Sequence, residues 1–224
     1  MPTFQRARSE EQREIRRRTI LDTTVTMLGE MPVGAISLNE LSRRIGLAKS
    51  NVLRYFESRE AILLELLDRA WQEWNADLPG LLAAAVDPGR PVEERSERLA
   101  AVLTDSLAER RMLCDLLSAQ AGVLEHNVSP EVAARHKRAT MANVGALAEL
   151  ARRHVPELGE DSERMCASAI LAVGAVWTHA RPSAAMLAAY EADPALAVMR
   201  MEFVPSLRDI LATLVAGTLA RRRA

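Results

Sequence analysis

The chain has 224 residues, of which 49% are apolar and 26% charged, and its formal net charge is −1. This composition excludes a long disordered or fibrous protein, and the length allows one or two domains. Only 4% of the residues are aromatic. Because Ala, Leu, Arg and Glu abound while alternating Val, Ile and Thr are scarce, we predict an all-α protein with about nine helices.

The charge is distributed unevenly along the chain. Residues 1–58 hold ten basic and seven acidic residues, a net charge of +3, whereas residues 59–224 hold 19 basic and 23 acidic residues, a net charge of −4. A basic N-terminal part on an acidic body is typical of a DNA-reading module joined to a second domain. We therefore predict a DNA-binding domain over residues 1–58 and a second domain over residues 59–224.

Several other classes of protein are disfavoured. Cys114 and Cys166 lie far apart without metal-ligand spacing, so we expect no metal and no cofactor. No common nucleophile, phosphate-loop or dinucleotide motif occurs, so we expect no catalytic residues and no enzyme. The N-terminus lacks an apolar signal segment, and the most apolar stretches, Ala169–Trp177 and Ile210–Ala220, are about half a membrane span in length. We expect a reduced, cytoplasmic protein without a membrane partner.

The first two elements are predicted from periodicity and capping. We expect residues 1–8 to form a disordered basic arm, followed by a helix from about Ser9 to Leu28 with a buried stripe on one face. Ser37-Leu-Asn-Glu40 matches a capping box, in which Ser37 accepts from the Glu40 amide and Glu40 returns to the Ser37 amide. It opens a helix over Leu38–Ile45 that buries Leu38, Leu41 and Ile45. Gly46 then suits a left-handed turn.

The remaining helices follow from caps and prolines. We predict a helix over Lys49–Phe56, with Val52 and Phe56 inward, and a fourth helix that Ser58 caps and Pro79 ends. Further helices are expected near residues 92–108, 109–122, 130–153, 161–180, 183–190 and 203–222.

Residues 37–56 have the organisation of a helix-turn-helix. Two short helices meet at a Gly turn, and an exposed second helix fits the major groove of DNA, where Asn pairs with adenine and Arg or Lys with guanine. The alternative is a plain antiparallel helix pair with a solvated polar face, and the pattern alone leaves both open. The predicted base-reading residues are Lys49, Ser50, Asn51 and Arg54, and Tyr55 and Arg59 are predicted to hold phosphates. Ser37, at the start of the motif, is also predicted to bind DNA.

This region resembles the tetracycline-repressor (TetR) family. The resemblance is carried by Ile20-Leu-Asp-Thr-Thr-Val-Thr-Met-Leu28, by Ser37 to Phe56 and by Ser58-Arg-Glu-Ala-Ile-Leu63; beyond these segments the chain agrees with the family in length and helical character. It implies three N-terminal helices for DNA, a C-terminal helical bundle for ligand and dimer, and binding of a homodimer to a palindromic operator.

Two positions depart from the family pattern. Ala48 stands where a capping Ser or Thr is usual, and loss of such a cap typically costs about 1 kcal/mol. Leu53 stands where a phosphate-binding Tyr is usual, and Tyr55 is the candidate to replace it. In addition, arginines between Arg6 and Arg18 either contact phosphates or form a solvated helix end balanced by nearby glutamates.

Two C-terminal helices carry stripes of small and apolar residues. Paired across a two-fold axis, they would make a four-helix dimer interface, while the alternative is an intramolecular core. The predicted interface residues are Ala167, Leu171, Gly174 and Thr178, with Ile210, Leu214 and Gly217.

The same domain offers candidates for a ligand pocket. Thioether, indole and aliphatic surfaces suit adaptable apolar cavities, although Met at helical spacing equally fills cores. The candidates are Met112, Leu116, Leu117, Trp177, Met186 and Tyr190.

These patterns favour a DNA-binding transcriptional regulator whose partners are double-stranded operator DNA, a second copy of the chain and a small apolar or amphipathic ligand. In this interpretation the ligand releases a repressor from its operator. The alternatives are a regulator controlled by a protein partner without a small-molecule inducer, and a helical enzyme or scaffold that does not bind DNA.

Overall fold

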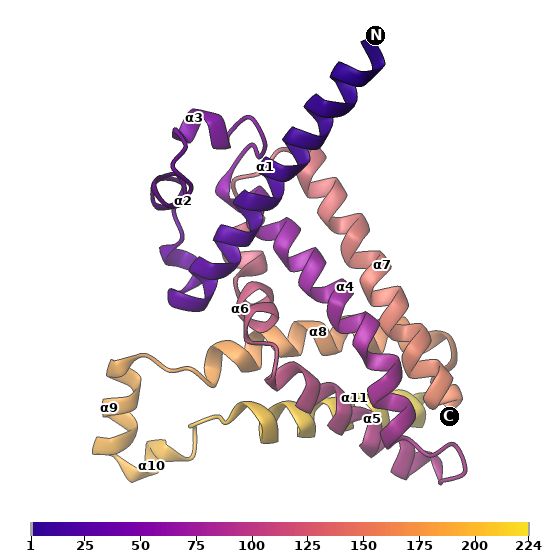
Figure 1. The fold of residues 1–224 in the computed structure, drawn as a ribbon. Coiled ribbons are helices and arrows are strands. Elements are labelled where there is room, and N and C mark those ends of the chain that lie inside the picture. Colours follow the sequence, from indigo (N-terminus) through magenta and orange to yellow (C-terminus); the bar gives the residue numbers. More distant parts are fainter. Residues whose placement is uncertain (1, 224) are drawn as a thin grey trace. The chain divides into compact units, whose positions relative to one another are not determined.

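The computed structural model describes the backbone of residues 2–223 and the side chains of residues 10–222. Within this part the chain forms eleven α-helices and no strand, which confirms the predicted all-α class (Figure 1). The residues group into two compact units. Unit 1 comprises Met1–Arg69 and Ala119–Lys137, and unit 2 comprises Ala70–Ser118 and Arg138–Ala224. The division after residue 58 stays a prediction, because this grouping reflects packing and not function.

Unit 1 begins with the long helix α1 (Pro2–Glu30). Its buried face includes Ile20, Leu21 and Met27. Because α1 starts at Pro2, the expectation of a disordered arm over residues 1–8 is wrong for residues 2–8, and Met1 lies outside the described residues. The physical reason is local: proline is tolerated in the first turn of a helix, and the Gln, Arg and Ala residues that follow are strong helix formers.

The rest of unit 1 is built from short elements. A 3-10 turn (Val33–Ala35) leads into α2 (Leu38–Ile45) and α3 (Lys49–Val52), and the first turns of α4 follow. Leu41 is buried, as predicted, while Leu38 and Ile45 are only half-buried. Residues 119–137 are attached to this unit by Ser129, whose backbone N–H donates to the Glu57 carboxylate at 2.6 Å.

Helix α4 (Arg59–Ala85) is longer than predicted, because it continues through Pro79. The expectation that Pro79 ends the helix is therefore wrong. Leu78 and Leu82 flank the proline and are fully buried, so packing holds both sides of the helix in place. Pro79 itself is exposed. On an exposed face, water can satisfy the carbonyl that a proline leaves without its helical donor, which lowers the cost of continuing the helix.

Unit 2 is a helical bundle that begins with the part of α4 from Ala70 on. Its main other helices are α5 (Val92–Ala108), α6 (Arg111–Ala119), most of α7 (Pro130–His154), α8 (Ser162–His179) and α11 (Phe203–Arg223). Helix α11 packs against α5 and α8. The Trp74 indole N–H of α4 donates to Ser106 Oγ of α5 at 2.9 Å. The predicted helix over residues 109–122 ends earlier, at Ala119, and a π-helical turn (Gln120–Leu124) replaces its last part.

The two helices between α8 and α11 are poorly buried. Helices α9 (Ala184–Ala192) and α10 (Pro194–Ala197) bury none of their residues, and α10 was not predicted. Within the described residues, one helix, α11, is long and apolar enough over Phe203–Arg222 to cross a membrane by length and composition alone. A core helix can pass the same test, and α11 buries Leu207, Leu211 and Val215 within unit 2.

Candidate nucleic-acid interface

Ser37 caps helix α2 as predicted. Its hydroxyl oxygen accepts from the Glu40 backbone N–H at 3.2 Å. The predicted return contact of Glu40 to the Ser37 amide is replaced by ion pairs with Arg43 at 2.6 Å and Arg44 at 2.9 Å. Hydrogen bonds from Arg43 and then Arg44 lower the pKa of Glu40 to about 2. Arg44 also pairs with Glu30 at 2.6 Å, which ties α2 to α1.

The turn between α2 and α3 depends on Gly46. This residue is left-handed, with φ 71° and ψ 29°, as predicted, and a side chain there would strain the backbone. Ala48 then precedes α3 in an extended conformation without a side-chain cap. The expected absence of a side-chain cap at Ala48 is therefore confirmed.

Helix α3 is shorter than the predicted recognition helix over Lys49–Phe56, because it ends at Val52. The following residues form tight turns, in which the Arg54 N–H donates to Asn51 O at 3.3 Å and the Tyr55 N–H to Val52 O at 2.9 Å. Val52 and Phe56 are buried, as predicted. The Phe56 N–H also donates to Val52 O at 3.2 Å, so a helical backbone bond joins the two buried residues.

Arg17 of α1 fixes the position of this turn. Its Nη1 donates to Tyr55 O at 3.2 Å, and its guanidinium carbon lies 4.3 Å from the centre of the Phe56 ring. The same guanidinium pairs with Glu65 of α4. Three separate segments of unit 1 are thereby joined through one side chain.

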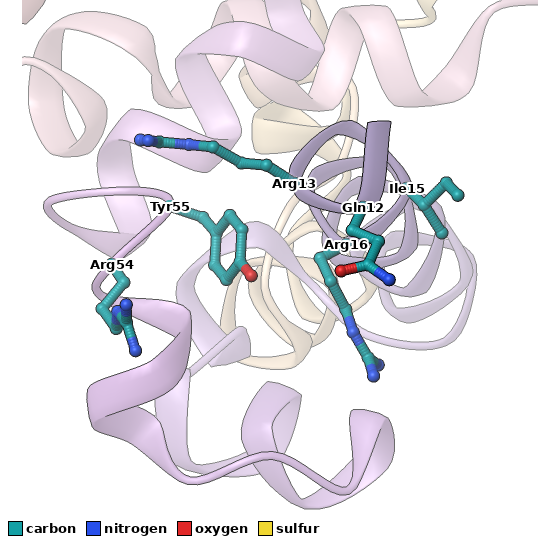
Figure 2. A pocket seen from close by; sticks show the side chains of 6 residues that line it. All are labelled: Gln12, Arg13, Ile15, Arg16, Arg54 and Tyr55. Carbon is teal, nitrogen blue, oxygen red and sulfur yellow. The ribbon is translucent and has the colours of Figure 1, made fainter. Parts of the chain in front are cut away.

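The polar side chains on and after α3 fall into two groups. Lys49, Ser50 and Asn51 are exposed on α3 itself. Arg54 and Tyr55 instead line a hollow of about 710 Å³ together with residues of α1 (Figure 2). The contributors from α1 are Gln12, Arg13, Ile15 and Arg16.

Arg59 has a structural environment that the sequence did not reveal. Its Nη1 donates to Ile36 O at 2.9 Å, and its Nη2 pairs with Glu60 at 2.7 Å. The start of α4 is capped by Ser58, whose oxygen accepts from the Ala61 N–H at 3.1 Å, as predicted. Phosphate anchoring by Arg59 stays a prediction, and Arg59 would have to share its donors between protein and DNA.

Arg13 and Arg16 were predicted only as part of the broad basic segment from Arg6 to Arg18. The side chains of Arg6 and Arg8 lie outside the described ones. A helical wheel would have distinguished Arg13 and Arg16 from the other charged residues of α1. Each residue advances a helix by about 100°, which puts Arg13 and Arg16 on one side of α1 and Glu11 and Glu14 on the other.

The predicted pocket residues of unit 2 do not form one group. Trp177 is buried on α8, where its indole N–H donates to Asp115 of α6 at 2.8 Å and its ring meets Phe203 edge-on at 4.7 Å. Leu116 and Leu117 are buried on α6, and Met112 is half-buried there. Met186 and Tyr190 instead lie on α9, which buries no residue.

The predicted dimer residues occupy two different environments. Leu171 is 77% exposed on α8, and Ala167 and Thr178 are also exposed. Gly174 faces the interior, because a Cβ there would lie 3.2 Å from Leu117 O. On α11, the predicted residues Ile210, Leu214 and Gly217 are all half-buried.

Both cysteines are buried and unbridged. Burial raises the pKa of the Cys114 thiol and of the Cys166 thiol to about 12, so both stay protonated and unreactive. Among the described side chains, no group of three or more His, Cys, Asp and Glu is arranged to hold a metal ion.

The fold and the exposed α2–Gly–α3 motif define a helix-turn-helix DNA-binding regulator. Residues 20–66 match the family described as "Bacterial regulatory proteins, tetR family", and residues 68–222 match "Tetracyclin repressor-like, C-terminal domain". The second match covers more than half of the chain. The chain therefore belongs to the TetR family of transcriptional regulators, which confirms the resemblance found in the sequence.

Individual relatives agree with this assignment. The HTH-type transcriptional regulator EthR of Mycobacterium tuberculosis is 34% identical over 71 residues, which is 32% of this chain and 33% of EthR. EthR of Mycobacterium bovis matches to the same extent. The aligned part is thus about a third of the length of these curated relatives. Among solved structures, the fatty acid degradation regulator FadR from Bacillus halodurans has a TM-score of 0.54 at 15% identity, covering 89% of this chain and 98% of that chain, which shows the fold.

Proposed function

We propose that the chain is a homodimeric repressor that binds a palindromic operator and is released by a small apolar or amphipathic ligand. The observation that carries this proposal is the exposed α3, which presents Lys49, Ser50 and Asn51 directly after the Gly46 turn. Asn can pair with adenine and Lys with guanine in the major groove, and Ser accepts either partner. The proposed regulator is a binding protein and not an enzyme, and it acts in the cytoplasm.

Uncovered apolar surface in unit 2 supports the dimer. Leu171 is exposed on α8, and only 28% of the most apolar 18-residue window of α11 is buried within the chain. Helices α8 and α11 pack against each other, so their outer faces are neighbours. Two such helices from each copy form the four-helix arrangement of many obligate dimers.

Buried polar atoms in unit 2 support a ligand with a polar end. Asn75 of α4 donates to Asn143 O of α7 at 3.0 Å, which places the two helices side by side. One turn earlier, Trp71 Nε1 on α4 and Thr140 Oγ1 on α7 are buried without a hydrogen-bond partner among the described residues, as is Asn75 Oδ1. Unsatisfied buried polar atoms cost about 1–3 kcal/mol each, so a ligand or ordered water that satisfies them is favoured.

Selection of genomic DNA tests the DNA-binding part of the proposal. Purified protein is incubated with sheared genomic fragments, and the retained fragments are sequenced. We expect a palindromic site whose half-sites are separated by about one helical turn or a multiple of it. Enrichment of no fragment over input would contradict the proposal.

Thermal shift tests the ligand part. The protein is heated with each member of a panel of apolar and amphipathic metabolites, and hits are added to the operator complex. We expect a hit to raise the melting temperature and to release the operator, because it favours a conformation that binds DNA poorly. Trp71→Phe, which keeps an aromatic six-membered ring but removes the N–H donor, should reduce the shift. A hit that tightens operator binding would contradict release by ligand.

A further inference from the structure

Residues 183–202 form an arm between α8 and α11 that the rest of unit 2 does not cover. None of these residues is buried, and residues 191–200 are all exposed. Leu196 is 43% exposed, Met199 69% and Val198 84%. Figure 1 shows α9 and α10 clear of α5 and α11, beyond the end of α8. The arm therefore presents apolar side chains to the outside of unit 2.

The helices of the arm are too short to be stable without packing. Helix α9 has nine residues and α10 has four. Isolated helices shorter than about 12–15 residues are marginal in water. Ser183 accepts from Met186 N and Asp193 from Ala195 N, which caps both helices but buries no apolar surface. We therefore expect the arm to pack against a surface that lies outside it.

A groove between α5 and α11 is a suitable surface. Its volume is about 410 Å³, and the small and apolar residues that line it from α11 are Ala212, Ala216, Leu219 and Ala220. Glu93 and Glu97 line it from α5. An apolar groove with carboxylates beside it is complementary to a segment that combines aliphatic side chains with a basic one.

Arg200 gives the arm that basic side chain. It is the only basic residue of the arm, and it directly follows Val198 and Met199. Arg200 and Glu97 are both exposed, and neither has an ion-pair partner among the described side chains. The arm and the groove therefore match in apolar character and in charge.

The arm and the groove of one chain lie at opposite ends of α11. The arm enters α11 at Phe203, and Ala216 lies about 20 Å further along the axis at about 1.5 Å per residue. A two-fold axis perpendicular to α11 runs the α11 of a second copy in the opposite direction. The start of α11 in one copy then lies beside the end of α11 in the other, which brings each arm to the groove of the other copy.

We propose that the arm crosses to a second copy of the chain, where Val198 and Met199 enter the groove between α5 and α11 and Arg200 pairs with Glu97. This exchange of arms rests on the proposed homodimer. Each copy covers the groove of the other, so the contact is made twice across the two-fold axis. The dimer is then held by two reciprocal arms in addition to the outer faces of α8 and α11.

Cross-linking of a mixed dimer tests the exchange. Chains with Val198→Cys and chains with Ala216→Cys carry different tags, are co-expressed, are purified through both tags in turn and are treated with a short bismaleimide. We expect a covalent dimer on a denaturing gel, with the linker between positions 198 and 216. The native thiols should not react, because Cys114 and Cys166 are buried and burial raises their pKa to about 12.

Met141→Cys in place of Val198→Cys is the matched control for the cross-link. Met141 is 73% exposed but lies on α7, outside the arm, so its mixed dimer with Ala216→Cys should give no covalent product.

A charge exchange tests the polar contact. Arg200→Glu places two carboxylates together and should speed subunit exchange between differently tagged dimers by about two- to fivefold, the size expected for an exposed ion pair. Glu97→Arg in the same chain restores opposite charges and should return the rate to the wild-type value. Arg153→Glu, the same change at an exposed position of α7, should leave the rate unchanged.

The outcomes are distinct. If wild-type protein is monomeric in light scattering, the proposed homodimer itself fails. If it is dimeric but the mixed dimer gives no more product than the Met141→Cys control, the arm does not reach the groove of the second copy and the exchange alone is wrong. A chain with both Val198→Cys and Ala216→Cys that is linked only within itself would show that the arm covers its own groove, which also overturns the exchange.

Discussion

The two units expose different kinds of surface. Unit 1 has several arginines around the end of α3, and among its described side chains the most exposed large apolar one, Ile15, is 56% exposed. Unit 2 exposes apolar side chains to a greater degree, with Leu171 at 77% and Val198 at 84%. Unit 1 thus presents positive charge beside its helix-turn-helix, whereas unit 2 presents exposed apolar side chains. The contrast is between positive charge in unit 1 and exposed apolar surface in unit 2.

The largest effect is expected from a charge on the apolar surface of unit 2. Leu171→Glu places a carboxylate in the proposed dimer interface, and an unpaired buried charge costs about 3–5 kcal/mol. We expect the variant to be monomeric in size-exclusion chromatography with light scattering, and to lose cooperative binding to both half-sites.

Met141→Glu is the matched control for this variant. Met141 is 73% exposed on α7 and lies outside the predicted interface, so the same substitution should leave the dimer intact. A Leu171→Glu protein that remains dimeric at the wild-type concentration range would show that α8 does not form the interface.

The next prediction tests whether Asn51 of unit 1 contacts the bases or the DNA backbone. Asn51→Ala removes a side chain that can pair with adenine, and we expect an operator affinity lower by about 1–3 kcal/mol. Affinity for a random-sequence duplex of equal length and its salt slope should stay at the wild-type values, because Asn51 is neutral. Equal losses on both duplexes would place Asn51 on the backbone instead.

Gly174→Ala tests whether the small residues of α8 serve the core or the dimer. A Cβ at this position meets Leu117 O at 3.2 Å, and overpacking typically costs about 1–3 kcal/mol. We expect a lower free energy of unfolding in urea with an unchanged dimer dissociation constant. Gly145→Ala on α7, where nothing lies within 4 Å, should instead stabilise the protein by up to about 1 kcal/mol.

Restoring the missing cap tests the start of α3. Ala48 already has an extended cap conformation, so Ala48→Ser should gain a side-chain acceptor and stabilise the folded protein by about 1 kcal/mol. Ser37→Ala, which removes the existing cap of α2, should shift the urea midpoint in the opposite direction. If Ala48→Ser lowers the midpoint, the open end of α3 is not a source of instability.

The smallest effect concerns pH. Burial lowers the pKa of His136, which Asp68, Lys137 and Glu125 face, the last with its Oε1 3.6 Å from His136 Nε2. The unfolded chain takes up a proton at a pH of about 6.5, and the folded chain does so only at lower pH. Stability should therefore be greatest above this value and fall as the pH drops through the lowered pKa. His136→Gln should remove that part of the pH dependence of urea unfolding, and an unchanged profile would contradict the assignment.

Local signals in the sequence predicted the parts of the helix-turn-helix that depend on one or two residues. Ser37 and Ser58 cap helices, and Gly46 adopts the left-handed turn, because each needs only its own side chain, or the lack of one, and the adjacent backbone. The inward pair Val52 and Phe56 also follows from spacing. These features do not require a knowledge of distant residues.

The failures have a different cause. Pro79 does not end α4, because Leu78 and Leu82 bury the helix on both sides of it. Helix α9 confirms the helix predicted over residues 183–190, whereas α10 lies beyond that range and was not predicted. At Pro79 a local rule was overridden by packing that the sequence does not display.

The all-α class, the family and the position of the helix-turn-helix could be predicted from the residues alone, because capping, glycine conformation and helical periodicity are local properties. The end of α3 and the charges that lie beside it depend instead on tertiary packing. Arg17 lies 38 residues before Tyr55 and holds it by a single hydrogen bond and a contact with Phe56. Arg13, Arg16 and Arg54 consequently line one hollow. Such a convergence depends on how segments pack, and packing joins residues whose separation in sequence carries no periodic signal.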